Sequence, residues 1–190
     1  MNPEALRNSV FLDQPDALVE NFLGGVPDRW GRMTPLSRRL IVETGILLYQ
    51  RGPHSPGIKF SEQKRCAGLI GATRRGSLET DRAFIESMMG EQGIPSPALF
   101  GYTLPNIPLA ETAVFFGLVG PVYAIFADRQ PLQQAVEEAR MILTTMPQVH
   151  MMFACEFDYF DKDDRESLFS VTLAAVDRDA ESNTGLPEME

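Results

Sequence analysis

The chain has 190 residues, of which 44% are hydrophobic and 23% charged, and its formal net charge is −9. These proportions are ordinary for one globular domain and exclude a wholly disordered or fibrous chain. The negative charge argues against nucleic acid as a partner, because affinity for phosphate backbones comes mainly from Lys and Arg. Residues 1–82 hold 12 Lys and Arg against 9 Asp and Glu. This mildly basic part is either a site for an acidic partner or an ordinary solvated face of mixed arginines.

The N-terminus and the two cysteines are typical of a protein in a reducing compartment. The first residues have no basic segment followed by an apolar stretch, and no apolar run reaches the roughly 20 residues that cross a bilayer. We therefore expect a cytoplasmic protein. Cys66 and Cys155 lie in apolar runs without a CxxC partner, which predicts reduced, buried thiols and no metal site.

The first third of the chain predicts one short strand and one long helix. Ser9-Val10-Phe11-Leu12 is the first candidate strand. Thr34-Pro35 then supplies a cap residue followed by proline at the first helical position, which predicts an amphipathic helix ending near Gly52-Pro53. The apolar stripe of this helix comprises Leu36, Leu40, Ile41, Leu47 and Leu48. From Pro53 to Phe60 the chain has no periodicity, which indicates a loop.

Apolar runs and helical patterns alternate through the rest of the chain, as in an α/β layer structure. Further strands are predicted at 66–72, 122–126, 149–157 and 168–176, and further helices at 78–89, 105–116 and 131–145. With the first candidate strand this makes five strands. We expect residues 1–177 to form a single domain and residues 178–190 to form an acidic, disordered tail.

Several segments, in the same order along the chain, resemble the N-terminal half of a β-ketoacyl synthase. Phe116-Gly117-Leu118-Val119-Gly120-Pro121 is similar to the FGLxGP turn of that family and is the strongest signal. Weaker likenesses precede and follow it at Arg32–Arg38 (RMxxLSR), Ser77–Asp81, Thr103–Pro108, Phe153–Glu156 and Phe169–Val176. The resemblance covers most of residues 29–177. It implies one thiolase-like half, with a mixed five-stranded sheet and helices packed on both faces.

The resemblance places a former nucleophile turn at Asp128-Arg129-Gln130. In ketosynthases the strand after the GP turn leads to a cysteine at a helix N-terminus, where the helix dipole and free amides lower the thiol pKa and stabilise the oxyanion. Counting from Gly120-Pro121, that cysteine position falls on Arg129. A guanidinium stays protonated and cannot attack a thioester. The resemblance thus implies no catalytic residue in this turn, and no cofactor or metal.

We expect structural roles for the residues of this turn and for the histidines and Cys155. We expect Asp128 to cap the following helix, and Arg129 to pair with Asp128 or Glu156, to bind an anion or to point into solvent. The two catalytic histidines of the family belong to its C-terminal half, so we expect His54 and His150 to be structural or surface residues. Cys155 lies on a strand away from the turn.

Three functions follow from the resemblance. The leading one is a non-catalytic accessory subunit of fatty-acid-like or polyketide-like acyl chain biosynthesis, similar to a chain-length factor. The second is a malonyl- or acyl-thioester decarboxylase that works with a partner chain, since some ketosynthase-like domains carry glutamine in place of the cysteine, and a shift of one residue in the count would put Gln130 there. The third is a small acyl-ligand binding protein with an apolar groove between Phe115-Phe116 and Val122.

The family also implies the partners. Its members dimerise by pairing the strand that corresponds to Val122–Phe126 with its mate, and this segment has no internal charge or proline to prevent pairing. We therefore expect a dimer, either with a second copy of the chain or with a full-length ketosynthase. An acyl carrier protein is a further possible partner, and neither a membrane nor a nucleic acid is expected.

Overall fold

The computed structural model describes residues 2–51, 56–89, 93–162 and 166–178, with side chains described outside 160–170. Four strands form one mixed sheet in the order β2-β1-β3-β4. β1 (Ala67–Thr73) is parallel to β2 (Val122–Phe126) on one side and to β3 (Met151–Lys162) on the other, and β4 (Glu166–Asp177) is antiparallel to β3. The predicted α/β class is confirmed, but the described sheet has four strands and not five.

The segment predicted as the fifth strand is helical. After α1 (Pro3–Asn8), Ser9–Phe11 forms a 3-10 turn, η1. Leu6 and Val10 lie one helical turn apart and are both fully buried, which favours helix at this point. The Arg38 guanidinium also binds the carbonyl oxygens of Val10 and Leu12, so these groups are not available to a sheet.

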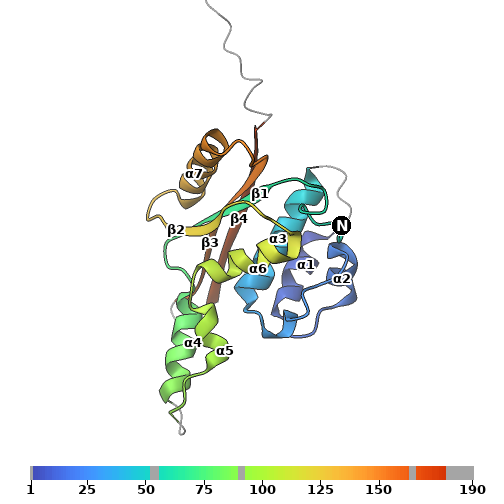
Figure 1. Ribbon diagram of the computed structural model, residues 1–190. Helices are drawn as coiled ribbons and strands as arrows, with labels where there is room; N and C mark the ends of the chain where they lie inside the picture. The colour runs from blue at the N-terminus through green and yellow to red at the C-terminus, as the bar shows by residue number, and fades with distance from the viewer. Residues whose placement is uncertain (1, 52–55, 90–92, 163–165, 179–190) are drawn as a thin grey trace, which may run out of the picture.

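Helices cover both faces of the sheet, as predicted (Figure 1). On one face, α3 (Pro35–Gln50) and α6 (Asn106–Phe116) pack over a core that includes Leu69, Phe153 and Phe157. On the other, α7 (Pro131–Thr145) packs over Ile70 and other small or apolar strand residues. Neighbouring residues of β1 thus point to opposite faces, and all seven of them are buried.

Close packing of α6 on the sheet depends on a glycine in β1. A Cβ atom at Gly71 would lie 2.5 Å from Cε1 of Phe157 and 2.8 Å from Cδ2 of Leu109. Any larger residue would have to displace a buried aromatic ring. The glycine therefore allows the helix and the ring of Phe157 to reach the same strand.

The other predicted helices and strands are present with small changes in their ends. The helix at 78–89 is α4 (Leu78–Met89), and the helix at 105–116 begins one residue later, at Asn106. α4 and α5 (Pro97–Tyr102) project together from the body of the molecule (Figure 1). The short elements α1, α2 (Ala17–Leu23), η2 (Trp30–Arg32) and α5 were not predicted.

Two expectations concern the ends and the exterior of the domain. Arg178, assigned to the tail, is attached to the domain, because its guanidinium donates to the carbonyl oxygens of Met146 at 2.7 Å and Val149 at 3.0 Å. Residues 179–190 lie outside the described residues. Among the helices that the structure describes, none has the length and apolar character to span a bilayer.

Candidate functional site

β1, β2 and β3 are parallel, so they run toward the same end of the sheet. In α/β proteins, ligands usually bind at this carboxyl end of the strands. The turn after β2 lies there and leads directly into α7. It remains attached to β1, because the N–H of Ala127 donates to the carbonyl oxygen of Thr73 at 2.9 Å. The position predicted for the former nucleophile is therefore at the junction of a strand end and a helix N-terminus.

Asp128, Arg129 and Gln130 are all exposed in this turn. Gln130 adopts the left-handed conformation, with φ 48° and ψ 55°, and occupies the N-cap position of α7 without a capping bond from its side chain. Pro131 accounts for this helix start, because proline disfavours the right-handed helical conformation in the residue before it. The prediction that Asp128 caps the helix is wrong, since the cap position is two residues further along.

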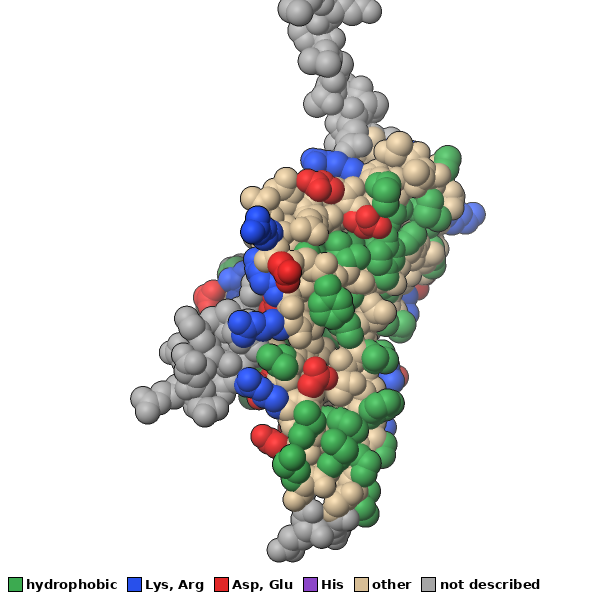
Figure 2. All heavy atoms as spheres, turned by 90° about the vertical axis from the view of Figure 1, so that its left-hand side faces the viewer, with side chains coloured by type: hydrophobic (Ala, Val, Ile, Leu, Met, Phe, Trp, Pro, Cys, Tyr) green, Lys and Arg blue, Asp and Glu red, His purple; other side chains and the backbone are tan. Residues whose placement is uncertain are grey.

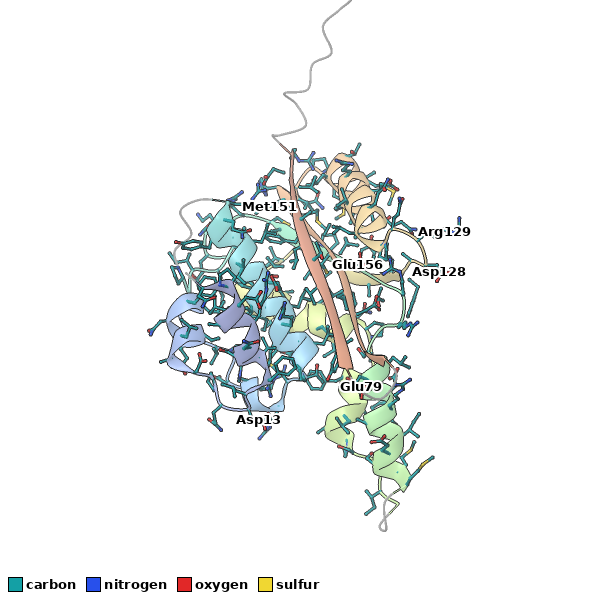
Figure 3. The ribbon with its side chains drawn as sticks, turned by 180° about the vertical axis from the view of Figure 1, so that it is seen from behind. Asp13, Glu79, Asp128, Arg129, Met151 and Glu156 are labelled. Carbon is teal, nitrogen blue, oxygen red and sulfur yellow. The ribbon has the colours of Figure 1, made fainter. Side chains whose placement is uncertain are left out.

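Arg129 does not pair as predicted. Among the described residues its guanidinium forms no ion pair, and the carboxylate of Glu156 pairs instead with Arg74. Figure 3 shows Arg129 at the outer side of the turn, away from Glu156 on β3. The backbone carbonyl of Arg129 accepts a hydrogen bond from Nε2 of Gln134 at 2.7 Å. The pairing alternatives are thus excluded for these residues, and the arginine extends from the surface.

A buried carboxylate that sequence reasoning missed organises the neighbouring turn, after β1. Asp158 on β3 is 2% exposed, and its Oδ1 accepts hydrogen bonds from the Thr73 hydroxyl at 2.6 Å and the Arg75 N–H at 2.9 Å. The Arg74 N–H also points at this carboxylate, at 3.2 Å. The Nε of Arg74 in turn donates to the carbonyl oxygen of Asp128 at 3.2 Å. Asp158 and Arg74 thus connect β3 to the turns that follow β1 and β2.

The prediction of buried thiols holds for Cys155 and is wrong for Cys66, which is only partly buried. Cys155 is fully buried on β3, on the face covered by α3 and α6, and this burial raises the pKa of its thiol. His150 precedes β3, and its Nδ1 accepts a hydrogen bond from the N–H of Cys66 at 3.2 Å. Its role is therefore structural, as predicted. His54 lies outside the described residues.

A cavity of about 530 Å³ lies elsewhere, between the end of α6 and the loops at 23–29 and 57–59. Phe115 and Phe116 line it, but Val122 does not, so it is not the groove predicted for an acyl ligand. Glu111 at its wall binds Arg29 at 2.6 Å and accepts from the Tyr102 hydroxyl at 3.1 Å. Burial, together with this carboxylate, raises the pKa of Tyr102 to about 12. The acidic and basic groups at this wall thus bind one another.

No protein-family model and no curated protein sequence matches the chain. Among solved structures, the ishigamide ketosynthase/chain length factor matches with a TM-score of 0.63 and 16% identity, over 84% of this chain and 47% of its own. A β-ketoacyl synthase from Burkholderia phymatum STM815 matches with a TM-score of 0.53 and 16% identity, over 70% of this chain and 31% of its own. A ketosynthase in complex with its chain length factor from Xenorhabdus doucetiae matches with a TM-score of 0.47 and 18% identity, over 65% of this chain and 45% of its own. This TM-score is too low to support an argument. The chain thus spans about half or a third of the solved chains, and the likeness shows the fold.

Proposed function

For a chain that has the thiolase-like fold of ketosynthases, we propose the function of a non-catalytic accessory subunit, which binds a full-length ketosynthase in fatty-acid-like or polyketide-like acyl chain biosynthesis. The observation that carries the proposal is the turn before α7. It has the strand-to-helix position of a nucleophile, but it holds a carboxylate, a guanidinium and an amide and no thiol. None of these groups forms an acyl-enzyme in ketosynthases.

An exposed apolar surface beside β2 supports the partner. Val119 before β2 and Phe126 at its end are 62% and 70% exposed, and Phe100 and Leu104 in the neighbouring α5 region are exposed as well. We call these four residues the β2-edge face. Figure 2 faces the side of the molecule on which β2 and α4 lie in Figure 1, and it shows hydrophobic side chains exposed along that side. Large apolar side chains that are exposed on one part of a protein often mark an interface. We assign it to the ketosynthase, because the structural likeness includes a protein named as a ketosynthase/chain length factor.

The β2-edge face gives the test of the proposal. Phe126→Asp should weaken binding to the ketosynthase at least 30-fold, because a charge replaces the most exposed aromatic side chain of the proposed interface. The partner is first identified by native mass spectrometry of the chain isolated from its own cells, and affinity is then measured with the purified proteins. Leu18→Asp is the matched control, since Leu18 is an exposed apolar residue on α2, on the opposite side of the molecule. Equal affinity of both variants, or no ketosynthase in the complex, would contradict the proposal.

The same proposal predicts that the folded chain forms no acyl-enzyme. Incubation with a reactive acyl thioester should leave its intact mass unchanged, because the buried Cys155 thiol has a raised pKa and is inaccessible. Cys66→Ser removes the half-buried thiol, so that any remaining adduct reports Cys155. In denaturant Cys155 should react, which controls for the reagent. A stoichiometric adduct on Cys155 of the folded variant would contradict the proposal.

One observation favours the decarboxylase as a second candidate. Gln130, one residue beyond the position counted from the sequence, has the strained left-handed backbone at the N-terminus of α7, and its amide is exposed. Amide groups at a helix N-terminus can stabilise an oxyanion. Release of carbon dioxide from a malonyl thioester by the assembled complex, lost on Gln130→Ala, would decide for this function. An acyl chain retained by the isolated protein would instead decide for the acyl-binding alternative.

A further inference from the structure

β2 is the outer strand of the sheet, and its backbone N–H groups point alternately toward β1 and away from the sheet. The N–H of Leu69 donates to the carbonyl oxygen of Pro121, and the N–H of Ala127 donates to that of Thr73. Because backbone groups alternate in direction along a strand, the odd-numbered residues of β2 face β1. The N–H groups of Val122, Ala124 and Phe126 therefore point outward, to the edge where another strand would pair.

The central one of these three donors is occupied. The N–H of Ala124 donates to Oδ1 of Asn106 at 2.7 Å. Asn106 is the first residue of α6, which packs against both β1 and β2, so the helix holds the side chain beside the strand edge. The acceptor that a partner strand would offer to Ala124 is thus replaced by a side chain of the same molecule.

An antiparallel partner needs this donor in most of its registers. Pairing of β2 with a second β2 about a two-fold axis uses the outward N–H groups, and five residues offer only three of them. Every arrangement centred on the strand requires Ala124. A second copy would therefore have to displace Asn106, and at Ala124 it would only exchange one hydrogen bond for another.

We propose that the Asn106 side chain, by occupying the outward N–H of Ala124, prevents β2 from pairing with a second copy of the chain. β2 has no internal charge or proline, the usual devices that protect a sheet edge, and Asn106 supplies the protection from a neighbouring helix. The predicted homodimer by pairing of Val122–Phe126 is thereby opposed. The side chains of the β2-edge face remain free for a partner that binds without adding a strand.

Amide hydrogen exchange on the isolated chain tests the hydrogen bond between Asn106 and Ala124 and needs no partner. At a concentration where the protein is monomeric, Asn106→Ala should speed exchange of the Ala124 amide at least 10-fold, because the acceptor is removed. Asn106→Asp keeps an oxygen acceptor at this position and should leave the exchange rate within about 2-fold of the wild type. The outward amides of Val122 and Phe126 are internal controls and should not change. An equal rate in wild type and Asn106→Ala, or acceleration by both variants, would overturn the proposal.

Sedimentation at increasing concentration tests the consequence. Asn106→Ala should self-associate at least 10-fold more tightly than the wild type, whereas Asn106→Asp should behave as the wild type. Adding Ala124→Pro to Asn106→Ala removes the donor itself, and proline is tolerated at an outward edge position. This double variant should lose the gained association. The proposal is wrong if Asn106→Ala stays as monomeric as the wild type, or if the double variant still associates. Either result would show that Asn106 does not prevent pairing of β2.

Discussion

Arg38→Ala should lower the free energy of unfolding by about 3–4 kcal/mol, because a buried guanidinium holds the N-terminal segment onto α3. Arg38 is 2% exposed. Its Nε donates to the carbonyl oxygen of Trp30 at 2.8 Å, and its Nη1 donates to those of Val10 and Leu12. Alanine would leave these acceptors with fewer donors, and the bonds to Trp30 and Val10 are buried from water. Hydrogen bonds to charged groups are also the stronger ones.

Urea unfolding followed by circular dichroism measures this effect, and Arg51→Ala is the matched control. Arg51 also pairs across a long stretch of sequence, with Asp177, but both side chains are partly exposed. Surface pairs contribute about 0–1 kcal/mol, so the control should unfold at nearly the wild-type urea concentration. Amides of residues 6–12 should exchange faster in Arg38→Ala than in the control. Similar stability of the two variants would mean that the N-terminal segment is held by its apolar contacts alone.

The periodic elements could be predicted from the sequence because their signals are local. The helix at 131–145 and the strand at 122–126 are present with the predicted ends, since an apolar stripe predicts a helix that packs on one side, and an aromatic, β-branched run between turn residues favours a strand. The N-terminal segment could not be predicted in this way. Its conformation depends on Arg38, which lies some 26 to 28 residues away from the carbonyl oxygens of Leu12 and Val10.

The arginines show the limit of composition as a guide. One interpretation of the basic first half is a solvated face, yet Arg38 is buried and Arg39 and Arg7 both pair with the buried Glu43. A count of charges cannot distinguish an exposed arginine from one that binds backbone carbonyls or a buried carboxylate. Only the three-dimensional arrangement separates the structural arginines from those free to meet a partner, such as Arg129.

The sequence could locate the turn at residues 128–130 through its resemblance to the ketosynthase GP turn. It could not locate Asp158, whose hydrogen bonds support the neighbouring turn. The GP turn led by counting to residues 128–130, which lie at the predicted strand-to-helix junction. Asp158 gave no signal, because it sits in a run of apolar and acidic residues near the middle of a long strand. Its importance comes from its register, which places it beside the residues that follow β1.

Asp158→Ala should have an effect similar to that of Arg38→Ala, about 3–4 kcal/mol, because it removes the acceptor of three donors at once. The Thr73 hydroxyl would then lose its acceptor in a buried position, and the N–H groups of Arg74 and Arg75 would lose theirs in a partly buried turn. The Thr73 hydroxyl oxygen also accepts from the N–H of Gly76 at 2.7 Å, so its orientation depends on the same carboxylate. The turn leads into α4, and the exposed α4 and α5 should therefore loosen before the sheet unfolds.

Thermal unfolding and amide exchange distinguish this role from that of a simple surface charge. Asp158→Asn retains one acceptor oxygen and should lose about half as much stability as the alanine variant. Glu156→Ala is the matched control two residues earlier on β3, where the carboxylate pairs with the partly exposed Arg74, and it should cost less than about 1 kcal/mol. Amides of α4 should exchange faster in Asp158→Ala and not in the control. If Glu156→Ala were as damaging as Asp158→Ala, the ion pair with Arg74 and not the buried acceptor would organise the ends of the three strands.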